Sequence, residues 1–141
     1  MRILALICLL LFAGSALSEP INDRRALFNY QMSCQGCHAP DGSGASSVPR
    51  MKDQVGLFLS TQAGRDYLVR VPGSAVSALD DAELAEVLNW IVREFAGASV
   101  AEPFEPYTAE EVGRLRQEPL REVENYRVML LNDIALARAA P

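Results

Sequence analysis

The chain has 141 residues, of which 50% are hydrophobic, and its 13 basic and 18 acidic side chains give a net charge of −5. This length favours one domain with an extension, and the acidic balance argues against nucleic acids and anionic membrane surfaces as partners. It permits a protein partner with a basic docking patch, although a solvated acidic surface without any partner would have the same composition.

The first 18 residues have the pattern of a secretory signal peptide. Arg2 precedes an apolar run from Ile3 to Ala13, and small residues lead up to a predicted cut after Ser18. An uncleaved anchor is the alternative, but the apolar run is too short to span a bilayer comfortably. Cleavage would remove Cys8 and leave two cysteines, and it would place the mature protein in the periplasm.

A helix is expected from about Asn22 to Gln31. Asn22 or Asp23 can cap it, because both side chains can accept hydrogen bonds from the first helical turn. Its predicted buried face, read from helical spacing, consists of Ala26, Leu27 and Tyr30.

Cys34, Cys37 and His38 then form the pentapeptide C-x-x-C-H, which is the attachment site of a c-type haem. Each thiol can add to one vinyl group of the porphyrin, and the imidazole can bind the iron. His38 is the only histidine of the chain, so the one imidazole stands where the motif requires it. A zinc site would need four ligands and a thioredoxin-like pair a βαβ context, and neither is visible. We therefore expect one covalently bound haem c.

The stretch from Ala39 to Ala78 is rich in glycine and proline and is predicted to be mostly loop. Short helices are expected from Met51 to Ser60 and from Ala63 to Leu68. So long an irregular stretch is unusual in a compact domain, but a large flat apolar ligand would give these loops a surface to pack against.

The next helix has the strongest signals. Asp80 and Glu83 have the spacing of a capping box, and Gly97 is placed to end the helix. Its apolar stripe consists of Leu84, Val87, Leu88 and Ile91, with Trp90 beside it and Phe95 at its end.

A linker and a C-terminal helical extension are expected after this helix. Thr108 and Glu111 predict a second capping box, and Pro119 interrupts the helix that they open. The helix beyond it has an apolar face of Leu120, Val123, Leu130, Leu131 and Ile134. The predicted parts are a signal peptide over 1–18, a haem domain over 19–97, and the linker and extension over 98–141.

Residues 24–95 resemble a class I, monohaem cytochrome c of the small bacterial type. Besides the haem motif, the resemblance rests on Tyr30 four residues before Cys34, on the D-G-x-G turn at 41–44, and on Trp90 in the last helix. It implies an all-α, cytochrome c-like fold with a loop-rich middle. In the family, the aromatic residue at the position of Trp90 packs against the first helix.

Val48-Pro49-Arg50-Met51 resembles the family's proline-x-hydrophobic step. The resemblance implies that the Pro49 carbonyl accepts a hydrogen bond from the far nitrogen of His38, which would fix the imidazole tautomer. Met51 then takes the hydrophobic position on the same side of the haem, so Pro49 and Met51 are candidate cofactor-binding residues alongside Cys34, Cys37 and His38.

The sequence departs from the family at the second iron ligand. The family usually has a methionine several residues before the last helix, where this chain has Val71, which cannot bind iron. The position is then vacant or water-bound, another side chain binds, or the register is shifted. Alternative ligands are Tyr67, which could equally bond a haem propionate, Ser74, Asn89 and, in the extension, Met129. Met32 and Met51 are expected in the core.

The resemblance implies one-electron transfer from an exported dehydrogenase or similar donor to an acceptor. The sequence has no second histidine for a peroxidase base and no second haem motif, so we expect a carrier rather than an enzyme. Val71 motivates an alternative, namely gas binding, sensing or peroxidase-like chemistry at an open iron. A haem-bearing subunit that stabilises a larger complex is a further possibility.

Overall fold

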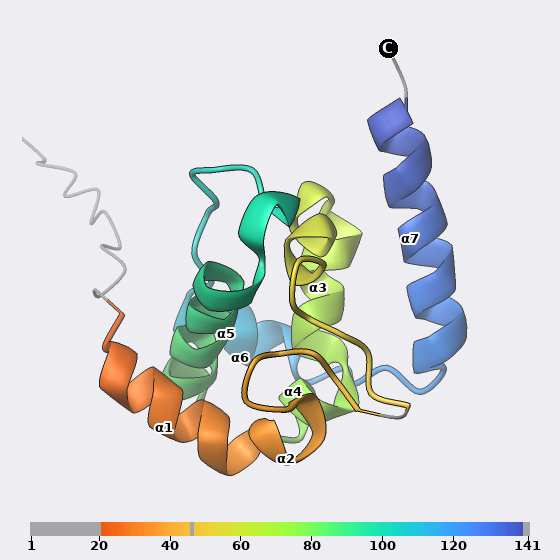
Figure 1. Ribbon diagram of the computed structural model, residues 1–141. Coiled ribbons are helices and arrows are strands. Elements are labelled where there is room, and N and C mark those ends of the chain that lie inside the picture. The colour runs from red at the N-terminus through yellow and green to blue at the C-terminus, as the bar shows by residue number, and fades with distance from the viewer. Residues whose placement is uncertain (1–20, 46, 140–141) are drawn as a thin grey trace, which may run out of the picture.

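The computed structural model describes residues 21–45 and 47–139, so the predicted signal peptide lies outside the described residues. This part of the chain is helical, with no strand and one isolated bridge between Ala45 and Val48 (Figure 1). The predicted all-α fold class is therefore confirmed. Among the described helices, none is long and apolar enough to cross a membrane.

α7 stands along one side of the molecule next to α3 (Figure 1). In chain order the helices are α1 (Asp23–Ser33), α2 (Gln35–His38), η1 (Val55–Ser60), α3 (Gln62–Arg70), α4 (Pro72–Ala75), α5 (Asp81–Phe95), η2 (Gly97–Ser99), α6 (Ala109–Leu115) and α7 (Val123–Ala139).

The predicted helix caps are present at α1 and α5. The side chain of Asn22 accepts a hydrogen bond from the backbone N–H of Arg25 at the start of α1. Asp80 and Glu83 form both halves of the capping box that opens α5. Both signals are local in sequence, which is why the sequence alone could locate them.

Two details of the helix predictions are wrong. Leu27 is 41% exposed, because the buried face of α1 is narrower than expected and is formed by Ala26, Asn29 and Tyr30. At α6, Thr108 accepts a hydrogen bond from the N–H of Glu111, but the Glu111 carboxylate binds Arg65 instead of completing the second capping box.

The loop-rich middle contains the two short helices that were expected, together with a third. The first is the 3-10 helix η1, which begins at Val55 because turns occupy the preceding residues. The second, α3, extends to Arg70, and α4 follows with Pro72 at its first position, where the missing N–H costs no helical hydrogen bond.

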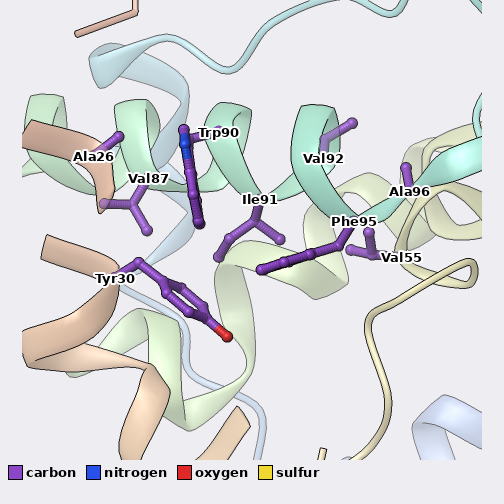
Figure 2. Packing of buried hydrophobic residues seen from close by; sticks show 9 residues of the cluster. All are labelled: Ala26, Tyr30, Val55, Val87, Trp90, Ile91, Val92, Phe95 and Ala96. Atoms are coloured by element: carbon purple, nitrogen blue, oxygen red, sulfur yellow. The ribbon is translucent and has the colours of Figure 1, made fainter. Parts of the chain in front are cut away.

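The main core joins α1 to α5 through aromatic rings (Figure 2). The ring centroid of Tyr30 lies 5.2 Å from that of Trp90 and 5.4 Å from that of Phe95. The expectation that Trp90 packs against the first helix is therefore confirmed.

The C-terminal residues are tied to this core by polar and apolar contacts. Asn89 of α5 exchanges two hydrogen bonds with the backbone of Tyr107, of 2.9 and 2.7 Å. On α7, Leu130 and Ile134 are buried, as their apolar face predicts, and they pack in one cluster with Phe58. The extension thereby reaches η1 and α3, which border the site described below.

Candidate functional site

A mostly apolar cavity of about 350 Å³ lies among α2, η1, α3 and α5, with α7 on one side. Its volume falls in the range of small-molecule sites. Among the residues that line it are all five that the sequence predicts to bind the cofactor, namely Cys34, Cys37, His38, Pro49 and Met51. The apolar walls include Val55, Phe58, Leu68, Leu84, Val87, Leu88, Ile91, Val92 and Val123. The fold thus brings the predicted residues together in one place.

α2, together with Cys34 immediately before it, presents the two thiols and the imidazole to this cavity. The backbone N–H groups of Cys37 and His38 both donate to the carbonyl of Cys34, at 3.1 and 3.0 Å. Both thiols are free, and burial raises the pKa of Cys34 to about 11, with nearby Cys37 adding to the effect. Cys34 is therefore a neutral thiol at physiological pH.

Tyr30 fixes the backbone immediately after His38. Its hydroxyl donates a hydrogen bond to the carbonyl of Ala39, which has a positive φ of 60°. We expected Tyr30 only as a core aromatic, and this hydrogen bond was missed. Its spacing of four residues from Cys34 is the signal that points to such a role.

The D-G-x-G turn holds the following loop against α5. Gly42 has a φ of +71°, and a Cβ there would lie 2.9 Å from the ring of Phe95, so only glycine fits without displacement. Its carbonyl accepts the N–H of Met51 at 2.8 Å, and the N–H of Gly44 donates to the carbonyl of His38 at 3.2 Å. These bonds connect the loop that carries Pro49 to the turn that carries the imidazole.

His38 carries an unpartnered nitrogen inside the protein. Its Nδ1 is buried and has no hydrogen-bond partner among the described residues. Burial lowers the pKa of His38, and the Pro49 carbonyl opposes that effect. The carbonyl therefore lies close enough to act on the imidazole charge, but it is not within hydrogen-bond geometry of Nδ1. The predicted Pro49 hydrogen bond stays a prediction.

The α3 side of the cavity carries an aromatic stack. The ring of Tyr67 lies 5.0 Å from that of Phe58 and 6.2 Å from that of Tyr126, both nearly parallel to it. Tyr67 is 5% exposed and lines the cavity, as does Val71 one turn later. No hydrogen bond of the Tyr67 hydroxyl occurs within the part of the chain that the structure describes.

The structure separates the candidate second ligands into two groups. Met51, Tyr67 and Ser74 line the cavity. Asn89 does not, because its side chain is used by Tyr107. Met129 and Met32 also lie off the cavity, at 48% and 71% exposure, so the expectation that Met32 belongs to the core is wrong.

Two arginines also line the cavity, and sequence reasoning singled out neither. Arg50 binds Asp53 at 2.7 Å, whereas the guanidinium of Arg127 lies 5.8 Å from the ring centroid of Phe58. Arg127 has no carboxylate partner among the described residues. Its position one turn after Val123, on the apolar face of the last helix, is the signal that could have found it.

The residues present fit a covalently attached porphyrin. Two thiols and an imidazole share one turn, one imidazole nitrogen lies buried without a partner, and apolar side chains form most of the walls. A cavity of this composition can hold a flat apolar group and keep water away from it, while lining arginines can offset negative charge at its edge.

Comparisons with known proteins point in the same direction. A cytochrome c-552 of Thermus thermophilus is 31% identical to this chain over 134 residues, which cover 82% of this chain and 87% of the relative. A second cytochrome c-552 of the same species is 33% identical over 106 residues, which cover 62% of this chain and 81% of that relative. No protein-family model matches the chain.

Proposed function

The chain belongs to the cytochrome c-552 family of class I c-type cytochromes, and we propose that it is an exported carrier of single electrons with one covalently bound haem. The observation that carries the proposal is that Cys34, Cys37 and His38 meet on one turn at the wall of an apolar cavity. The haem supplies reversible one-electron chemistry at a potential set by its ligands and by solvent exclusion.

Each lining residue has a proposed task. Cys34 and Cys37 hold the haem through thioether links, and His38 binds the iron. Pro49 orients the imidazole and Met51 packs on the same side. Beyond these five, the guanidinium of Arg127, which lacks a carboxylate partner in the described part, offsets the charge of the haem carboxylates.

Electron exchange needs a haem edge close to the surface. Cys37 is exposed, which supports an accessible edge beside α2. Nearby on α1, Phe28 is 59% and Met32 is 71% exposed, and such apolar side chains suit short-lived docking. We propose a periplasmic dehydrogenase or similar protein as donor and a second redox protein as acceptor.

The division of the chain is part of the proposal. Residues 1–18 act as the signal peptide, 19–97 form the haem domain, and 98–141 form the linker and extension. The extension completes the haem site, since Val123 and Arg127 of α7 line the same cavity as the thiols.

Mass spectrometry of the mature protein, made in cells competent in cytochrome maturation, tests this function. The expected mass is that of the polypeptide after cleavage plus one haem. A mass equal to the bare polypeptide would contradict the proposal. Stoichiometric one-electron reduction of the purified protein would then support a carrier role.

We also propose that no methionine binds the iron. The family resemblance puts Val71 in the place of the usual ligand, Met32 and Met129 lie off the cavity, and Met51, which lines it, takes the hydrophobic position on the His38 side. The ferric protein should therefore lack the near-red absorption band of a methionine–iron bond. Such a band would show that a thioether binds after all.

An open position favours the second candidate function, namely gas binding, sensing or peroxidase-like chemistry.

A further inference from the structure

The phenol of Tyr67 is a polar side chain of the cavity that the proposed function does not use, and Tyr67 is among the least exposed of the polar lining residues. The side chain is 95% buried, because its exposure is 5%, and its hydroxyl has no hydrogen-bond partner in the described residues. The hydroxyl is not one of the buried atoms that lack a partner in the described residues, so it opens onto the cavity, where it can donate a hydrogen bond to a molecule that binds there.

Tyr67 and Val71 lie one helical turn apart at the end of α3. The N–H of Val71 donates to the carbonyl of Tyr67 at 3.0 Å, which is the i to i+4 spacing of one helical turn. Both residues line the cavity. The phenol therefore lies one turn from Val71, which we propose stands in the place of the usual iron ligand.

The surroundings of Tyr67 favour an uncharged partner. Phe58, Leu68, Val71 and Val123 line this side of the cavity, where a charged molecule loses its hydration. The nearby cation, Arg127, is the residue that we propose offsets the haem carboxylates. Burial raises the pKa of Tyr67, which nearby Arg127 opposes, so the phenol keeps its proton at neutral pH and can donate it in a hydrogen bond.

We propose that the space beside Val71 is a binding site for a small uncharged diatomic molecule, such as carbon monoxide or nitric oxide, with the Tyr67 hydroxyl as its hydrogen-bond donor. The site rests on the proposed function, because the molecule needs the haem iron, and on the absence of a methionine ligand. It adds to that function a ligand class and the residue that recognises it.

The test uses the full mature protein with its haem, reduced and titrated with carbon monoxide. We expect saturable binding. In Tyr67→Phe the C–O stretch should move to higher wavenumber, and dissociation should be about fivefold faster, as the loss of one ordinary hydrogen bond implies. The matched control is Tyr126→Phe, which changes the outer ring of the same stack, does not line the cavity, and should leave both values unchanged.

If Tyr67→Phe does not accumulate, the wild-type protein still decides the question. A phenolic donor carries an exchangeable proton, so the C–O stretch should differ between H₂O and D₂O. Equal stretches in both solvents, or in wild type and Tyr67→Phe, would overturn the donor assignment. Absence of carbon monoxide binding to a protein with intact covalent haem would overturn the site and leave the carrier function standing. Absence of covalent haem would overturn both.

Discussion

Tyr30 serves the core and the haem motif with one side chain. Its ring packs against those of Trp90 and Phe95 (Figure 2). Its hydroxyl donates a hydrogen bond to the carbonyl of Ala39. Burial raises its pKa to about 12, with the charges of Cys34 and Asp41 contributing, so the hydroxyl remains a donor throughout the neutral range. The residue thus couples the packing of α1 on α5 to the backbone after His38.

Tyr30→Phe keeps the ring and removes this hydrogen bond. The half-buried carbonyl of Ala39 then loses its donor, and we expect the free energy of unfolding to fall by about 1–2 kcal/mol. Guanidinium unfolding followed by haem absorbance measures the change. Tyr126→Phe, whose ring is in the α3–α7 stack, is the control and should stay close to wild type. Equal stability of wild type and Tyr30→Phe would show that the bond contributes nothing.

Cys37→Ala and His38→Ala should each prevent stable accumulation of the exported protein. The cavity between the helices then lacks its attached group, and a domain of this size buries too little apolar surface to be secure with an unfilled centre. Immunoblots of the exported fraction measure the amount. Ser47→Ala, at an exposed lining position, is the control and should accumulate normally. Wild-type amounts of a folded, haem-free variant would contradict the prediction.

At the scale of elements, polar clamps hold the helices that surround the cavity. Arg116, at the end of α6, donates to the carbonyls of Ala75, Ser77 and Leu79, the segment that leads from the cavity wall to α5. On the other side, Glu86 of α5 accepts hydrogen bonds from the start of α1. The Arg116 clamp positions the backbone that follows α4, on the side of the cavity that Val71 lines. The Glu86 clamp positions α1, which leads into the C-x-x-C-H motif.

The Glu86 clamp gives a pH dependence with a definite sign. Hydrogen bonds from Arg25 lower the pKa of Glu86 below its ordinary value of 4.5, although burial opposes them. The carboxylate therefore contributes stability that is fully present above 4.5 and is lost as pH falls through the lowered folded-state pKa. Glu86→Gln should cost about 1 kcal/mol at neutral pH, since Arg25 is half exposed.

Urea unfolding of wild type and Glu86→Gln between about pH 3 and pH 7 measures this dependence. The difference in the free energy of unfolding between the two proteins should shrink as the solution becomes acidic. Protonation removes the negative charge of Glu86 from wild type at low pH, whereas the substitution removes it at every pH. Glu94→Gln, at an exposed position of α5, leaves this clamp intact and controls for a change in net charge. A difference that is constant with pH would contradict the assignment.

At the scale of the whole molecule, the sequence was sufficient to predict those features that depend only on residues close together in the chain. The α1 and α5 caps and the meeting of Cys37 and His38 follow from local spacing, and the structure has them. It could not predict contacts between distant segments, such as Glu111 with Arg65, which replaced half of a capping box. The prediction that Met32 belongs to the core relied on its residue type alone and was wrong. Met32 is apolar, but it lies off the buried face of α1, which Ala26 and Tyr30 form.

The same long-range packing makes α7 a wall of the cavity that we propose holds the haem. Leu130 and Ile134 anchor it in the cluster with Phe58 and Tyr67, and Val123 and Arg127 line the cavity. A chain that ends after Pro119 should therefore open the haem to water. Because solvent exposure stabilises the charged ferric state, the reduction potential should fall, together with the midpoint of thermal unfolding.

Spectroscopic redox titration of the two proteins measures this shift. The control chain ends after Ala137, keeps Leu130 and Ile134 in place, and should match the full protein in potential. If the chain ending after Pro119 also matched it, α7 would not exclude solvent from the haem. A lowered potential in the shorter chain alone would show that solvent exclusion depends on the packing of α7, and that this small haem domain needs its extension to set its own redox chemistry.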